Sequence, residues 1–116
     1  MTLPSLMRAH LRELAKERTT TTYRDLANAL GLQPPNTIRQ AAELLEELFI
    51  EDHRSGVPSL AALVVSKVKN SIPALGFFQL AHTLGRYDGP ASGPAAAEYH
   101  AAELEAAWDY WSNDAG

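Results

Sequence analysis

The stretch Thr21–Leu48, TTYRDLANALGLQPPNTIRQAAELLEEL, determines how the rest of the chain is interpreted. Thr22 and Asp25, three positions apart, have the spacing of an N-terminal capping box, so we expect a helix to start at Tyr23. Gly31 can take the left-handed conformation that ends this helix after about eight residues. A helix this short is not stable alone, so it must pack against its neighbours.

A proline-rich connection leads from this short helix to a longer one. Pro35 disfavours a helical conformation in the residue before it, and Asn36 or Thr37 can cap the helix that follows. We expect this helix to cover residues 36–55, because Gly56 stops it. Apolar residues at helical spacing predict its buried stripe, which comprises Ile38, Ala41, Ala42, Leu45, Leu48 and Phe49.

The regions on either side of this pair of helices also carry periodic signals. Upstream, apolar residues at three- and four-residue steps predict an amphipathic helix near residues 4–17. Its apolar face comprises Leu3, Leu6, Met7, His10, Leu11 and Leu14, with Arg8, Arg12, Glu13 and Lys16 outside. Downstream, the β-branched and uncharged segment 60–67 predicts a short buried strand, followed by a polar turn. Residues 76–85 return to a helical period, and the alternative is a second strand that ends at Phe77 and Phe78.

We expect residues 1–90 to form one domain and residues 91–116 to form a loop and a C-terminal helix. The boundary between them falls in a segment rich in glycine and proline. This helix has an apolar stripe with steps of four, three, four and three residues, formed by Ala97, Ala101, Leu104, Trp108 and Trp111. Two roles remain open for the stripe. It either closes the core of its own chain or forms an assembly surface, such as a homodimer interface, around Leu104, Trp108 and Trp111.

The predicted order of three helices, a strand and a basic turn resembles a winged helix-turn-helix domain. Within it, TTYRDLANALGL is similar to the second helix of that class, with Ala27 as the small residue at the helix contact and Gly31 at the turn. The chain resembles small bacterial winged helix-turn-helix proteins, most of them uncharacterised. The resemblance implies a mainly α fold with a short strand or hairpin and an added C-terminal helix. The connection QPPN is one residue longer than the common turn.

The same segment is similar to the DNA-binding domain of alkylguanine alkyltransferases and their alkyltransferase-like relatives. The reactive Pro-Cys-His-Arg segment of that family is missing from this sequence, which contains no cysteine. Alkyl transfer to a thiol is therefore excluded, and no catalytic residue carries over.

The winged helix-turn-helix resemblance implies that the third helix enters the major groove of DNA. Its start would then present Asn36, Thr37, Arg39 and Gln40 to the base edges. Arginine can contact guanine through two hydrogen bonds, and asparagine or glutamine can do the same with adenine. Arg24, Lys67 and Lys69 complete the expected DNA-binding set, with the two lysines in the wing as contacts to the DNA backbone.

The charge of the chain leaves two functional classes open. The net charge is −4, yet residues 1–40 hold six Lys or Arg against three Asp or Glu, whereas the remainder holds four against eleven. The basic first third favours a DNA-binding protein. The acidic pI of about 5.5 favours the alternative, a protein-interaction module that regulates or inhibits a protein partner through the same fold.

Several other classes are not expected. The absence of cysteine excludes disulfides and thiolate zinc sites and fits the reducing cytoplasm. No apolar run reaches the length of a membrane span. His100 and Glu103 would supply only two metal ligands and are expected to be a solvated pair, and no serine has the setting of a nucleophile. We therefore expect a non-enzymatic protein without cofactor or metal.

Overall fold

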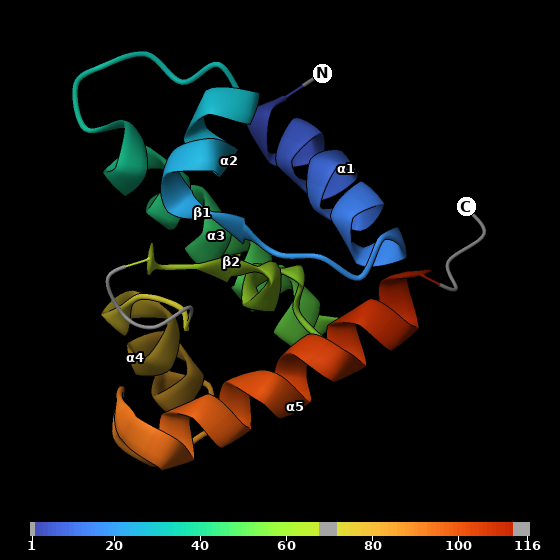
Figure 1. Cartoon of the computed structure of the whole chain (residues 1–116), viewed down its shortest axis with the longest axis vertical. Coiled ribbons are helices and arrows are strands. Elements are labelled where there is room, and N and C mark those ends of the chain that lie inside the picture. The colour runs from blue at the N-terminus through green and yellow to red at the C-terminus, as the bar shows by residue number, and fades with distance from the viewer. Residues whose placement is uncertain (1, 68–71, 113–116) are drawn as a thin grey trace.

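Five α-helices and a small parallel sheet make up residues 2–67 and 72–112, the part of the chain that the computed structural model describes (Figure 1). In chain order these elements are α1 (Leu3–Lys16), β1 (Thr21–Thr22), α2 (Tyr23–Ala29), α3 (Thr37–Arg54), the 3-10 helix η1 (Leu60–Leu63), β2 (Val64–Val65), α4 (Leu75–Thr83) and α5 (Gly93–Ser112). The expectation of a mainly α fold is confirmed. The radius of gyration is 13.1 Å, close to the roughly 13 Å of a compact chain of this length.

Local signals place the ends of α2 as predicted. The Thr22 hydroxyl accepts a hydrogen bond of 3.1 Å from the backbone N–H of Asp25, and the helix starts at Tyr23. Gly31 has a φ of 68°, in the left-handed region where glycine carries no steric penalty. The short α2 packs against α3, which supplies the support that a helix of this length needs.

Asn36 takes the predicted cap position of α3, but the predicted capping by its side chain is wrong. Asn36 occupies the cap position with a φ of 60°, and its side chain makes no capping hydrogen bond. Instead, the Gln40 side-chain amide donates to the carbonyl oxygens of Gln33 and Pro35, at 2.9 and 2.8 Å. These bonds tie the proline-rich connection to the first turn of α3.

The strand predicted at residues 60–67 is mostly a 3-10 helix. The Ser59 hydroxyl caps this helix by accepting from the N–H of Ala61, and only Val64 and Val65 are extended. They pair in parallel with β1, with Thr21 opposite Val64. Two parallel strands are not the antiparallel hairpin of a wing, and among the described residues one antiparallel bridge joins Ser66 to Ile72. The turn predicted between them includes residues 68–71, which lie outside the described residues.

The core lies where α1, α3, α5 and η1 meet, with α3 in the middle of the molecule (Figure 1). The predicted apolar faces of α1 and α3 point into it through Met7, Leu11, Leu45, Leu48 and Phe49. Leu3, Leu6 and Ile38 were also expected inside but are exposed, because each lies in the first turn of its helix at the rim of the molecule.

The C-terminal half of the chain differs from its predicted pattern in one helix. Helix α4 is formed as predicted and excludes the alternative strand, with Phe77 and Phe78 both buried. In α5 the predicted stripe is right in its C-terminal part, where Trp111 is buried and Leu104 and Trp108 are half-buried against the core. It is wrong in its first turns, where Ala97 and Ala101 are exposed and Ala96 and His100 are buried instead. Packing against α1 and η1 sets which positions of α5 are buried. No described helix has the length and apolar character needed to cross a membrane.

Candidate nucleic-acid interface

A cleft of about 390 Å³ lies between the N-terminal ends of α2 and α3 and the end of β2. The parallel pairing of β1 with β2 builds it, because the carboxyl ends of parallel strands meet at the same edge. Arg24 follows β1 and Lys67 follows β2, so both line the cleft, with Ile38 of α3 beside them. Ala74 closes this region, since its N–H donates to the Tyr23 hydroxyl at 3.0 Å.

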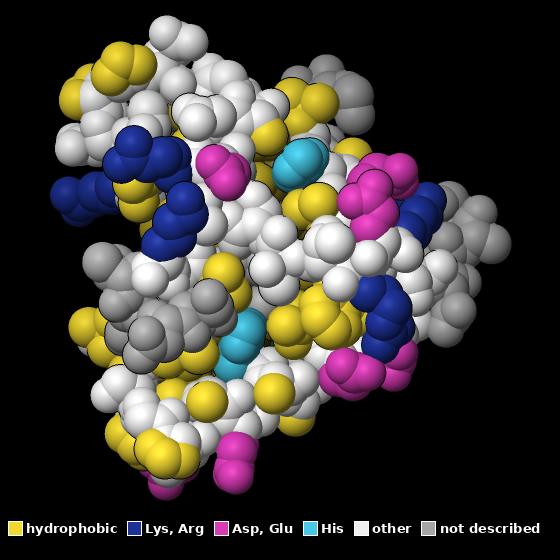
Figure 2. Space-filling model, in the orientation of Figure 1, with side chains coloured by type: hydrophobic (Ala, Val, Ile, Leu, Met, Phe, Trp, Pro, Cys, Tyr) yellow, Lys and Arg dark blue, Asp and Glu magenta, His cyan; other side chains and the backbone are white. Residues whose placement is uncertain are grey.

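The cleft carries positive charge. Arg24 and Lys67 are exposed, and neither forms an ion pair with another described residue. Figure 2 shows Lys and Arg side chains gathered at the left edge of the molecule, on the side where α2, α3 and β2 come together in Figure 1. No acidic residue occupies the first turn of α3, so the positive end of this helix faces the same side without a local negative charge.

The other residues predicted at the start of α3 are less free than the sequence implies. Arg39 is 79% exposed and lies 3.4 Å from Glu43 one turn later, a surface pair that is weak and open to exchange. Gln40 uses its amide nitrogen to hold the connection. Asn36 is exposed and Thr37 is half-buried, whereas Lys69 lies outside the described residues.

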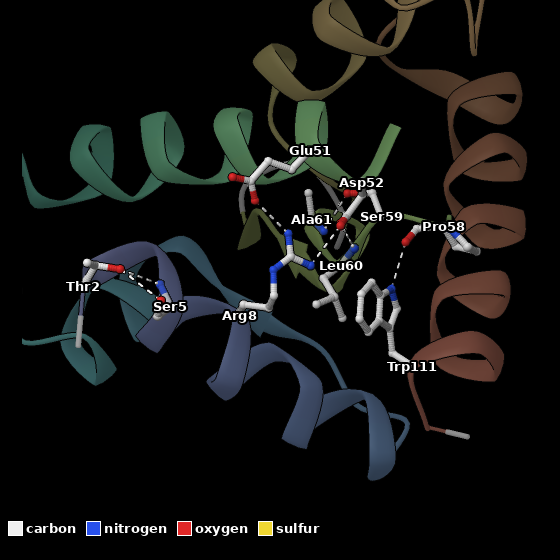
Figure 3. A network of polar contacts seen from close by, with 10 residues as sticks. All are labelled: Thr2, Ser5, Arg8, Glu51, Asp52, Pro58, Ser59, Leu60, Ala61 and Trp111. Atoms are coloured by element: carbon white, nitrogen blue, oxygen red, sulfur yellow. Dashed lines mark hydrogen bonds and ion pairs between the residues drawn. The ribbon is translucent and has the colours of Figure 1, made fainter. Parts of the chain in front are cut away.

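The remaining cations of the N-terminal third are mostly engaged elsewhere. Arg8 was expected outside, yet its guanidinium binds Asp52 at 2.9 Å and Glu51 at 3.0 Å (Figure 3). Arg18 binds Glu105 at 2.8 Å and Asp109 at 2.9 Å. The basic balance of residues 1–40 therefore does not form one continuous basic face. Burial raises the pKa of Asp52, and the bond from Arg8 opposes that shift.

His100 and Glu103 are not the solvated pair that the sequence predicts. His100 is buried, and its Nε2 lies 2.8 Å from the carbonyl oxygen of Ala62, so this nitrogen carries the proton. Burial lowers the pKa of His100. Glu103 accepts hydrogen bonds from Arg86 and from Tyr99 instead, and burial together with this carboxylate raises the pKa of Tyr99 to about 12. Among the described residues, no three potential ligands are placed to hold a metal.

The aromatic residues of α5 make contacts within their own chain. The Trp111 indole N–H donates to the carbonyl oxygen of Pro58 at 2.8 Å (Figure 3), and the Trp108 indole N–H donates to that of Thr19 at 3.1 Å. Trp108 and Leu104 are half-buried against the core. An assembly surface at Leu104, Trp108 and Trp111 stays a prediction, with Trp111 the least accessible of the three.

No family model, curated protein or solved structure matches the chain. The resemblance to winged helix-turn-helix proteins therefore stays a prediction. The sequence predicted only two of the three residues Arg24, Ile38 and Lys67 that line this cleft as functional residues. Arg24 and Lys67 were in the predicted DNA-binding set, whereas Ile38 was assigned to the core, because its helical spacing matches that of the residues that are buried.

Proposed function

We propose that this chain is a non-enzymatic DNA-binding protein that docks the start of α3 and the adjoining cleft on the double helix. The observation that carries the proposal is the position of Arg24 and Lys67. Two distant segments bring these cations, which form no ion pair with another described residue, to one cleft beside the N-terminal end of α3. Phosphates bind most readily where free lysine or arginine side chains and a helix N-terminus face the same side.

The order of the elements supports a helix-turn-helix type of docking. Three helices come first, with β1 between α1 and α2 and with β2 after α3, which is the order of a winged helix-turn-helix domain. In this arrangement the residues at the start of α3 approach the base edges, while Arg24 and Lys67 contact the backbone. The parallel pairing of β1 with β2 differs from the antiparallel wing of that class, and Lys67, which follows β2, lies at the cleft.

The acidic remainder of the chain limits the affinity. Glu43, Glu46 and Glu47 follow one to three turns into α3 and repel phosphate, so contact is confined to the start of the helix. We expect binding that is detectable at low salt and weakens as salt rises, with a slope of log affinity against log salt that is modest because few phosphate contacts carry the binding.

The test is fluorescence anisotropy with labelled genomic duplexes across a salt series. Arg24→Ala and Lys67→Ala should each weaken binding and reduce the slope of log affinity against log salt by about 0.9, the effect of one lost phosphate contact. Arg54→Ala is the matched control. It removes the same charge from an exposed position about 22 Å along α3 from Arg39, at 1.5 Å of rise per residue.

Two results would contradict the proposal. The chain does not bind DNA if genomic and random duplexes leave its anisotropy unchanged at low salt. Docking occurs elsewhere if Arg54→Ala lowers the slope as much as Arg24→Ala and Lys67→Ala do. Circular dichroism of each variant confirms that the fold is retained, which we expect because all three side chains are exposed.

A protein-interaction module is the second candidate, and a specific groove supports it. Leu3 and Leu44 lie with Glu43 and Glu47 in a groove of about 210 Å³ between α1 and α3. An apolar floor with an acidic rim suits an amphipathic, basic segment of a partner. A complex that survives nuclease treatment and is lost on Glu47→Lys, in a chain that does not bind DNA, would favour this candidate.

A further inference from the structure

Ile38 is placed unlike the other apolar residues of its helix. Its side chain is 47% exposed, although Ala41, Leu45, Leu48 and Phe49 on the same predicted stripe are buried. Among the described residues, the other large apolar side chains with comparable exposure are Leu3, Leu6, Leu75 and Tyr110. Of these five, Ile38 is the one that lines the cleft between Arg24 and Lys67. An apolar side chain at the start of α3 therefore lines the same cleft as the two cations assigned to the DNA backbone.

The chemistry of the major groove limits what such a side chain can recognise. Base edges in this groove carry hydrogen-bond donors and acceptors, and the one apolar group among them is the C5 methyl of thymine. The polar side chains that follow Ile38 already make contacts within the chain, since Arg39 pairs with Glu43 and the Gln40 amide binds backbone carbonyls. The Ile38 side chain, which is apolar and 47% exposed, forms no hydrogen bond or ion pair of this kind.

We infer that Ile38 is a specificity-determining residue that packs against a thymine methyl when α3 enters the major groove. This inference rests on the proposed DNA-binding function. Arg24 and Lys67 hold the backbone and place the first turn of α3 at the base edges, and Ile38 then discriminates thymine from cytosine at the position it meets. Desolvation of an exposed isoleucine and a methyl group drives this contact, so it adds no charge and no salt dependence.

The test removes the methyl group and nothing else. A duplex enriched by the chain from a random-sequence pool is synthesised with thymine and again with deoxyuridine, which keeps every hydrogen bond and every phosphate. The wild-type chain should bind the thymine form about fourfold more tightly for each methyl contacted, which is the effect of burying one such group. The salt slopes for the two forms should be equal, because the phosphate contacts are the same.

Ile38→Ala should bind both forms with the same affinity, and its fold should be retained because the side chain is exposed. The matched control is Leu6→Ala, which removes an exposed apolar side chain from α1 and should keep the preference for thymine. Equal binding of both forms by the wild-type chain overturns the inference and leaves DNA binding intact. A preference that persists in Ile38→Ala also overturns it, because another group then senses the methyl. Absence of binding to either form at low salt overturns both the inference and the proposed function.

Discussion

At the scale of single residues, Arg8 binds two carboxylates that differ in burial. Asp52 is 2% exposed and also accepts a hydrogen bond of 3.1 Å from the N–H of Leu60, so it joins α1, α3 and η1. The Glu51 side chain is 64% exposed, and its carboxylate pairs with Arg8 at 3.0 Å. Water screens the second pair and not the first, so the two adjacent carboxylates should contribute unequally to stability.

We therefore predict that Asp52→Ala lowers the free energy of unfolding by about 2–4 kcal/mol, because it removes the buried one of the two carboxylates that bind Arg8 and leaves the N–H of Leu60 without its acceptor. Glu51→Ala should cost less than about 1 kcal/mol, as is usual for an exposed pair. Urea unfolding of both variants measures the difference. Equal losses would show that burial does not determine the contribution of the two carboxylates.

At the scale of elements, α5 uses its two tryptophans differently. Trp111 is 9% exposed, lies under the guanidinium groups of Arg8 and Arg12 at 5.5 and 5.9 Å, and binds the carbonyl of Pro58. Trp108 is half-buried, with Arg18 at 5.2 Å from its ring. The arginines of α1 and Arg18 after it thus lie on the tryptophan rings of α5, and none of them lines the cleft.

Trp111→Ala should lower stability by about 3–5 kcal/mol, because it leaves a cavity in the core, whereas Trp108→Ala should lose about 1–2 kcal/mol from a partly exposed site. Thermal unfolding at low and high protein concentration measures both variants. If these residues act only in the core of their own chain, the melting temperature does not depend on concentration. A loss that appears together with a shift from dimer to monomer in sedimentation would instead place them at the predicted homodimer interface.

At the scale of the whole molecule, α5 completes the core that the helices before it begin. It packs on α1 and η1 and covers them with Ala96, His100, Ala107 and Trp111 (Figure 1). Its acids Glu105 and Asp109 also bind Arg18, so the negative charge of the C-terminal helix is partly neutralised on the side away from the cleft. The basic residues of the chain therefore divide between two places. Arg18 forms ion pairs at α5, whereas Arg24 and Lys67 line the cleft without an ion pair to another described residue.

A chain truncated after Gly93 should fail to fold cooperatively. Removal of α5 exposes the apolar residues of α1 and η1 that it covers, and burial of one tryptophan or leucine is worth roughly 2–3 kcal/mol in a domain of about 5–15 kcal/mol total stability. Far-UV circular dichroism during a urea titration measures the outcome. A truncated chain that keeps a sharp transition at the midpoint of the full chain would show that residues 1–93 form an independent domain.

The sequence by itself determined the features that depend only on residues close to one another along the chain. The mainly α composition, the start of α2 at the Thr22–Asp25 pair, its end at Gly31 and the helical nature of α4 were all predicted. Each signal acts within one or two helical turns, through a hydrogen bond or a backbone preference that does not depend on the rest of the chain. The start of α3, with Asn36, Thr37, Arg39 and Gln40, was located in the same way.

Only the tertiary structure decided which side chains meet and which are buried. The segment 60–63 coils into a 3-10 helix although its composition suits a strand, because Asp52 and Ser59 bind its backbone N–H groups. The phase of α5, the burial of His100 and the exposure of Ile38 follow from which neighbour each helix packs against, and helical period alone does not contain that information. Arg24 and Lys67 share a cleft because β1 and β2 pair in parallel, a contact between segments far apart in the chain that no local pattern encodes.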